Sequence, residues 1–405
     1  MTLTSSDRDW DLPTPQYHEE LRQHLESGEP EMWAWFSETA FPSAEAIAQA
    51  ELDLLKTSYR IDGGLHGDLV GAATLIAGRM GLDLGITLYQ ELGVGERNAR
   101  VLQLGNHVHV VFGGELLELL SYSEQQTVLA HELAHIALWD REDRAYRILD
   151  DMVHRMDAEP LAQDAVAETA RRLRLHTEVW ADAVARAITD DPNASISSIV
   201  KVNAGLRNVD PEAYLRQAQQ VLAADPSASQ GWTHPELHVR VACLAARDSA
   251  TPDETIRTLV EGPDDLDRLD LLGQTRLQEL AKRMLASATR IAPERSDRAN
   301  AKAYCDSYRT LTPLSPDVSP PVTGDAANPL DDGELGQAEP SVRFFCAALL
   351  VDQALLGDGA EAGLSETRPY SVEAERLGIH GEFDKILGRA TSRSASELRR
   401  LRAEV

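Results

Sequence analysis

The sequence predicts an α+β fold that is mostly helical, with a small β-sheet beside the helix that carries His131 and His135. Most of the 405 residues fall in long segments with the apolar spacing of helices. Three short apolar segments, alternating as strands do, lie together between residues 86 and 112. Helical patterns without strands resume toward the C-terminus, which predicts an all-helical region there. A composition of 43% hydrophobic and 26% charged residues is ordinary for a globular chain.

The N-terminal region is predicted to be helical before the strands begin. Residues Gln16–Tyr59 have a mostly helical pattern, and Gly63–Gly81 predicts a further helix. No apolar stretch reaches the ~20 residues needed to cross a bilayer, since the longest candidate, Leu69–Met80, contains Arg79. The first residues lack the basic start and apolar core of a secretory signal. We therefore expect a soluble, cytoplasmic protein without membrane insertion.

The three predicted strands are Ile86–Leu92, Ala99–Leu104 and His107–Phe112. An edge strand can hold an extended peptide through main-chain hydrogen bonds. We expect either Ala99–Leu104 or His107–Phe112 to be such an edge. His107 and His109 would share one face of their strand, and we expect an exposed or cleft-facing pair rather than metal ligands.

The most informative segment is His131-Glu132-Leu133-Ala134-His135. Residues four apart share a helix face, so His131 and His135 can bind the same metal ion. Glu132 sits one position round, where a carboxylate can hold a metal-bound water and take its proton. Two histidines and a glutamate on an apolar helix would be costly without a metal ion or other partners.

The surrounding residues predict that this segment is helical and mostly buried. Thr127–Leu138 contains no Gly or Pro, and Leu133, Ala134 and Ile136, which lie between and beside the two histidines, are uncharged. Ser123 followed three residues later by Gln126 predicts a capping box at the start of the helix. After this helix, Asp140–Pro160 predicts an amphipathic helix that serves as a surface connector.

A catalytic zinc site needs a third protein ligand and an open fourth position. Ala165–Ile188 predicts a long helix in which Glu178 and Asp182 share a face. We predict Glu178 as the third ligand, and Asp182 as acceptor of a hydrogen bond from the free N–H of a ligand imidazole. His176, on nearly the opposite face, is the alternative third ligand, although it brings no second carboxylate with it.

These motifs, with their flanking residues, resemble the M48 family of zinc metallopeptidases, which includes the CAAX prenyl proteases. Gly114–Leu138 is similar to the family's apolar helix, Ser-capped turn and HExxH helix. Glu178 to Asp182 is similar to its ExxxD motif, and Asn98-Ala99 resembles its Asn-Ala-Phe strand, with Arg100 in place of the aromatic residue. The resemblance implies a gluzincin fold of the zincin class and one Zn²⁺ per chain, with Glu132 as general base.

The resemblance also covers a downstream segment. Thr233-His234-Pro235, followed by Arg240, is similar to the family's Thr-His-Pro…Arg segment. It implies that His234 and Arg240 face the cleft and stabilise the oxyanion. A fixed donor and a fixed cation beside developing charge are worth several kcal/mol in a water-poor site.

We therefore expect a zinc-dependent endopeptidase that cuts peptides or unfolded protein segments bound as an extended strand. The alternative is a regulatory or partner-binding protein whose metal site cuts nothing, or a latent enzyme whose cleft is filled by residues 1–15 or by a Pro-rich loop. The presence of Glu132 favours the enzyme, since a structural site has no use for a general base. The net charge of -27 argues against nucleic acid as a partner, because phosphate binding needs Lys/Arg patches.

The chain is expected to divide into four parts. These are a peptidase domain (1–250), a helical region (251–310), a Pro/Asp/Gly-rich linker or exposed loop (311–340) and a C-terminal helical module (341–405). The three cysteines, Cys243, Cys305 and Cys346, lie far apart, which predicts reduced core thiols rather than a disulfide framework or a zinc ribbon.

Overall fold

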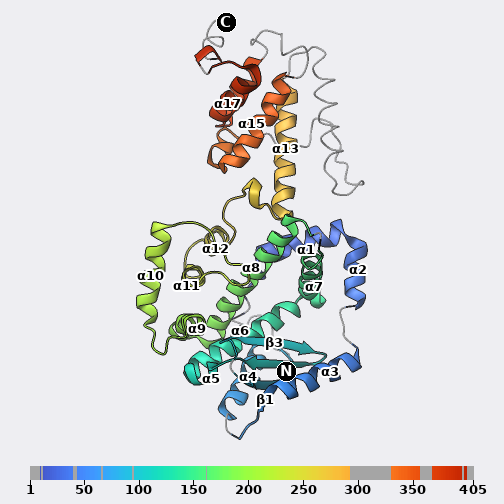
Figure 1. Cartoon of the computed structure of the whole chain (residues 1–405), viewed down its shortest axis with the longest axis vertical. Helices are drawn as coiled ribbons and strands as arrows, with labels where there is room; N and C mark the ends of the chain where they lie inside the picture. The colour runs from blue at the N-terminus through green and yellow to red at the C-terminus, as the bar shows by residue number, and fades with distance from the viewer. Residues whose placement is uncertain are drawn as a thin grey trace. The chain divides into compact units, whose positions relative to one another are not determined.

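The structure is a computed structural model that describes residues 10, 12–39, 43–64, 67–93, 95–160, 162–291, 330–355, 367–394 and 396–398. The chain divides after Gly262 into two compact units. Helices dominate both units, and the described residues contain one small mixed sheet, which confirms the expected α+β class (Figure 1).

The first unit contains the sheet and the helices that surround it. Its elements, in chain order, are α1 (Gln16–Gly28), α2 (Pro30–Thr39), α3 (Ala44–Thr57), β1 (Ser58–Ile61), α4 (Gly67–Met80), β2 (Gly85–Glu91), β3 (Ala99–Leu104), β4 (His107–Phe112), α5 (Leu116–Leu119), α6 (Tyr122–Trp139), η2 (Glu142–Arg144), α7 (Ala145–Asp157), α8 (Asp164–Thr189), α9 (Pro192–Ala204), α10 (Pro211–Ala224), α11 (Leu237–Ala246) and α12 (Pro252–Val260). All three predicted strands are present. The additional strand β1 lies partly in a segment that was predicted to be helical.

The sheet has the strand order β1-β2-β4-β3, so β3 is an edge strand and β4 is internal. This arrangement decides between the two candidate edges in favour of Ala99–Leu104. Strand β4 pairs parallel with β2 and antiparallel with β3. Apolar side chains from α3, β2 and β4 meet on one face, where Leu54 packs with Tyr89 and Val111. Helices α4 and α6 also contact the sheet.

Helix α6 begins with a capping box that lies two residues before the predicted one. The Ser121 side chain accepts a hydrogen bond from the Glu124 N–H, and the Glu124 carboxylate accepts one from the Ser121 N–H. The prediction of Ser123 and Gln126 as the capping pair was wrong. A buried partner favours the observed choice, because the Glu124 carboxylate also accepts hydrogen bonds from Ser197 and Lys201 of α9.

Helices α6 and α8 pack side by side through the centre of the first unit (Figure 1). Most residues of both helices are buried, and Leu133, Ile136, Trp180 and Val184 are among the least exposed. The predicted amphipathic connector is α7, and its apolar face is buried. Burial on most sides fixes the axes of α6 and α8, so side chains on their facing surfaces have defined positions.

The second unit is entirely helical in its described part. Its elements are η3 (Leu266–Arg268), α13 (Leu271–Ile291), η4 (Glu334–Gln337), α15 (Pro340–Leu355), α16 (Arg368–Arg376) and α17 (His380–Thr391). They share one apolar core that includes Met284, Leu350 and Phe383.

The division of the chain differs from the expected one in two respects. Helix α12 packs on α8 and α11 in the first unit, so the boundary falls after Gly262 and not after residue 250. The expected linker 311–340 lies outside the described residues up to 329, and its described part contributes Leu330 and Leu335 to the core of the second unit. Cys243 and Cys346 are buried free thiols, as predicted, and Cys305 lies outside the described residues.

Among the described residues, no helix combines the length and the apolar character that crossing a bilayer requires. This finding agrees with the sequence pattern of α4, which is the helix that contains the apolar stretch Leu69–Met80 and is interrupted by Arg79.

Candidate metal centre

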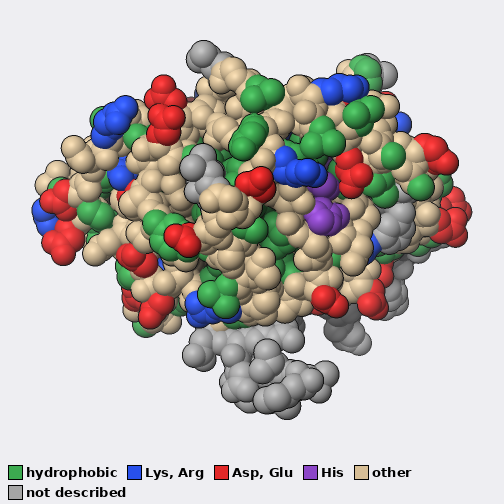
Figure 2. Space-filling view, turned by 90° about the horizontal axis from the view of Figure 1, so that it is seen from below, with side chains coloured by type: hydrophobic (Ala, Val, Ile, Leu, Met, Phe, Trp, Pro, Cys, Tyr) green, Lys and Arg blue, Asp and Glu red, His purple; other side chains and the backbone are tan. Residues whose placement is uncertain are grey.

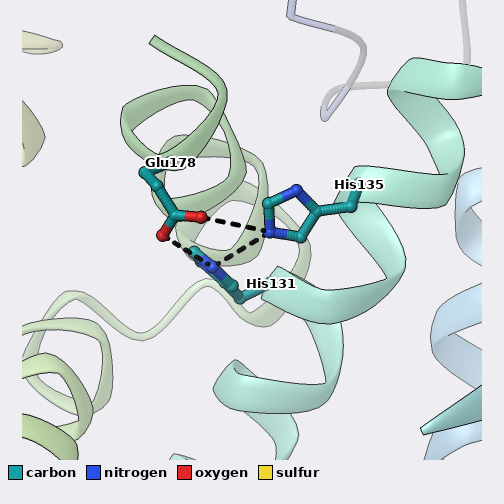
Figure 3. A group of neighbouring side chains, drawn as sticks. All are labelled: His131, His135 and Glu178. Carbon is teal, nitrogen blue, oxygen red and sulfur yellow. Dashed lines mark hydrogen bonds and ion pairs between the residues drawn. The ribbon is translucent and has the colours of Figure 1, made fainter. Parts of the chain in front are cut away.

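His131 and His135 of α6 converge with Glu178 of α8 (Figure 3). The two Nε2 atoms lie 3.3 Å apart. Glu178 Oε2 lies 3.4 Å from His131 Nε2, and Glu178 Oε1 lies 3.6 Å from His135 Nε2. These three residues form a group that could hold a metal ion.

The donor set fits a tetrahedral zinc ion. Zinc bonds to imidazole nitrogen and carboxylate oxygen are about 2.0–2.2 Å long, which places tetrahedral ligand atoms roughly 3.3–3.6 Å apart. The separation of 3.3 Å between the two Nε2 atoms falls in this range, and Glu178 approaches the two imidazoles with different oxygens, Oε2 at 3.4 Å from His131 and Oε1 at 3.6 Å from His135. Glu178 Oε2 is buried and has no hydrogen-bond partner among the described residues. A carboxylate oxygen in that position calls for a cation.

A second layer of contacts orients the ligands. His131 Nδ1 lies 2.9 Å from Asp182 Oδ1, one helical turn from Glu178, so its N–H can donate to this carboxylate as the sequence predicted. Arg240 of α11 donates from Nε and Nη2 to both oxygens of Asp182, at 2.8 and 2.7 Å. Arg240 is buried, and its Nη2 lies 3.8 Å from Glu178 Oε2.

This position adds a contact to the expected role of Arg240. Arg240 lines the cavity, as the resemblance implied, and its Nε and Nη2 are engaged with Asp182. A bidentate pair of this kind fixes the geometry of both partners. Arg240 therefore holds the carboxylate that orients His131, and its contact with an oxyanion stays a prediction.

Charge and burial act in opposite directions on the ionisation of the cluster. Burial disfavours the charged form of His131, but the hydrogen bonds and negative charges of Asp182 and Glu178 outweigh this effect and raise its pKa to about 10. Burial lowers the pKa of His135 to about 4. Burial also opposes ionisation of Glu178, yet the adjacent His131 imidazole and the other nearby positive charges hold its pKa well below the usual value.

Glu132 is buried next to these groups and lines the same cavity. Burial raises its pKa to about 7, with the positive charges of His131 and Arg240 opposing the shift. A carboxylate with a pKa near neutrality can both accept and return a proton under ordinary conditions.

The cavity at the cluster has a volume of about 300 Å³. The cavity is lined by His131, His135 and Glu178. Strand β3 forms one wall with the residues Ala99, Arg100 and Val101. Helix α9 contributes a second, uncharged wall that includes Ser198 and Ile199. Because β3 is an edge strand, main-chain groups along the cavity wall lack a neighbouring strand on that side.

His234 also lines the cavity, as predicted, and its Nε2 lies 3.5 Å from Glu178 Oε2. Its side chain is 43% exposed, and Nδ1 lies 3.0 Å from Thr233 Oγ1. The group of possible ligand atoms within 4.8 Å of one another contains His131, His135 and Glu178, without His234. Figure 2 shows one face of the molecule, on which histidine side chains are exposed between acidic and basic neighbours.

Other residues considered from the sequence lie elsewhere. His176 stacks on Tyr17 and lies 3.0 Å from Glu261, so the geometry favours Glu178 as third ligand. His109 is buried between α3 and the sheet, 3.8 Å from Glu51, and is neither exposed nor part of the cavity wall. His107 contacts it, at 4.9 Å between ring centroids, and bonds to Thr87.

The N-terminal segment, considered above as a possible plug of the cleft, is described only at residues 10 and 12–15. Trp10 is buried, the carbonyl of Pro13 accepts a hydrogen bond from the indole N–H of Trp180, and Thr14 bonds to Arg141. These contacts hold the described part of the segment against α8 and the end of α6. The other candidate plug, the Pro-rich loop, lies outside the described residues up to 329.

Sequence reasoning did not find the wall formed by α9 or the aromatic residue Trp139, which lines the cavity one turn after His135. Trp139 carries a recognisable signal, since it lies four residues from His135 on the same helix face. Ser198 and Ile199 carry none, because they reach the cavity only through the packing of α9 on α6.

Comparison of the chain with protein-family models, with curated proteins and with solved structures finds no match. The function must therefore be inferred from the site itself.

Proposed function

We propose that this protein is a zinc-dependent endopeptidase that hydrolyses peptides or unfolded protein segments, with a zincin-type catalytic unit of the gluzincin kind. His131, His135 and Glu178 would hold the metal. The decisive observation is Glu132: a metal site needs three ligands and their supports, but it does not need a further buried carboxylate that lines the same cavity outside the ligand group.

Zinc, when bound, polarises the scissile carbonyl and makes water a stronger acid. Glu132 takes a proton from the attacking water as its oxygen bonds to the carbonyl carbon. It then returns this proton to the amine nitrogen as the C–N bond breaks. His234 lies at the rim of the cavity, where its Nε2 can donate to the developing oxyanion.

Substrate binding is assigned to the edge of β3. An extended peptide beside Ala99–Leu104 would continue the sheet through main-chain hydrogen bonds. It would then pass over the three proposed metal ligands. Such pairing reads the backbone more than the side chains, which suits unfolded segments of varied sequence.

The proposal is tested by digesting a diverse peptide library and reading the cuts by mass spectrometry, with Glu132→Gln as the matched control. This substitution keeps all three proposed ligands. We expect cuts with the wild-type protein and a loss of roughly 10²–10⁴-fold in the variant. Metal bound equally by both proteins, with no cuts by either, would support a regulatory metal-binding protein instead.

A further inference from the structure

One face of α8 contacts the segment 229–240 at three positions along the helix. Asp182 binds Arg240, and Glu178 lies 3.5 Å from His234. Seven residues before Glu178, Arg171 contacts the backbone at the start of the segment. The helix that supplies the third proposed metal ligand therefore also contacts the segment that carries His234.

Arg171 is a buried arginine whose donors are directed to two different targets. Nη1 donates to the carbonyl oxygens of Ser229 and Gly231, at 3.2 and 3.1 Å. Nε and Nη2 donate to the two carboxylate oxygens of Glu168, at 2.6 and 2.7 Å. The side chain is 3% exposed, so these bonds form in a dry environment, where they are strong and costly to break.

The loop 229–236, here called the His234 loop, is closed by its own hydrogen bonds. The Glu236 carboxylate accepts from Ser229 Oγ at 2.7 Å and from the Gln230 N–H at 3.0 Å. Gly231 approaches the backbone of His234 so closely that a Cβ would lie 2.0 Å from the His234 carbonyl oxygen. The backbone position of His234 is thus tied to the position of residues 229–231.

We propose that Arg171 is a positioning residue for His234. It anchors residues 229–231 to α8, and the closed His234 loop transmits this anchor to the imidazole beside Glu178. The contacts of the His234 side chain itself are partly solvent-exposed, and such contacts hold a ring weakly. This inference rests on the proposed function, in which His234 donates to the oxyanion.

The first test is hydrogen exchange of the His234 loop in the full-length, zinc-loaded protein. Arg171→Met removes the anchor, while Glu168 keeps its bond to Arg172. The control is Arg186→Met, an equal change on the same helix, at an arginine that donates to the Leu244 carbonyl and to Asp248, both outside the His234 loop. We expect exchange in peptides covering 229–236 to speed up tenfold or more in Arg171→Met and far less in Arg186→Met, with zinc content unchanged in both.

The second test is kinetic. We expect Arg171→Met to lower kcat by about 10–100-fold with little change in KM, the size expected for a small misplacement of a catalytic group. The double variant with His234→Ala should be no slower than His234→Ala alone, because Arg171 acts through that residue. Arg171→Lys, which can reach only part of the acceptor set, should fall between wild type and Arg171→Met.

Unchanged loop exchange in Arg171→Met, or additive kinetic losses in the double variant, would overturn the inference. If the wild-type protein cuts no peptide, the proposed function fails, and loop exchange still decides whether Arg171 anchors the loop. If Arg171→Met does not fold, Arg171→Lys, which keeps a positive charge beside Glu168 and loses part of the anchor, takes its place in both tests.

Discussion

At the scale of single residues, the metal centre is a buried group of paired charges. Glu178 and Asp182 bring two carboxylates, which face Arg240 and, in the metal-free protein, the charged His131. A dication that displaces the His131 proton would take over its place beside Glu178. Asp182 connects two other side chains of the site, because it contacts both His131 and Arg240.

Asp182→Asn should therefore weaken zinc binding by about 10–100-fold, the usual cost of losing the carboxylate that orients a ligand histidine. The dissociation constant can be measured by competition with a chelating dye. Glu132→Gln is the control, since it changes a buried carboxylate of the same cavity that is not a proposed ligand. Equal affinities in wild type and Asp182→Asn would show that the contact with His131 does not support the metal.

Zinc affinity should also depend on pH above neutrality. The pKa of His131 is raised to about 10, so in the metal-free protein this imidazole still carries its extra proton at pH 8. A metal ion must displace that proton from Nε2. Between pH 7 and 9 we expect zinc binding to tighten by about tenfold per pH unit and to level off near pH 10.

The same shift predicts the direction of the stability change in the metal-free protein. A histidine pKa raised above its ordinary 6.5 stabilises the fold below that pH, and this contribution is lost as pH rises toward 10. A zinc dissociation constant that stays constant from pH 7 to 9 would contradict the assignment of a charged His131.

At the scale of elements, the site depends on two packed helices and one strand edge. The helices could be predicted from sequence because their periodicity and the HExxH spacing are local signals, and Glu178 followed from the geometry of one helix face. Strand β1 could not, since its pairing of Ser58 with Glu91 joins distant segments. The edge position of β3 depends on the strand order, which no local pattern specifies.

The start of α6 offers a direct comparison between the predicted and the observed cap. Ser121→Ala should lower the free energy of unfolding by about 1 kcal/mol, because the Glu124 N–H loses its acceptor. Ser123→Ala, at the position that the sequence pattern favoured, should have little effect. Both can be measured by chemical denaturation, and a larger loss for Ser123→Ala would refute the observed cap.

At the scale of the whole molecule, every residue assigned to the metal centre lies in the first unit. The second unit has its own core, formed by α13, η4, α15, α16 and α17. Its fold could be predicted only as helical, because apolar periodicity identifies the helices but does not specify how they pack on one another.

We therefore expect a shortened chain of residues 1–262 to fold and to bind one zinc ion as tightly as the full chain. Circular dichroism and metal competition would measure this. The full-length protein, prepared in parallel, is the reference. Loss of zinc binding in a folded shortened chain would show that the second unit contributes to the site.

The most direct test of the central claim is a zinc titration of metal-free protein in which bound zinc and peptide cleavage are measured in the same samples. We predict that cleavage by the wild-type protein rises in proportion to bound zinc and saturates at one equivalent. Glu132→Gln should bind the same single equivalent without cleaving. Full zinc binding with no cleavage by the wild type, or equal cleavage by Glu132→Gln, would contradict the assignment of a zinc peptidase that uses Glu132 as its base.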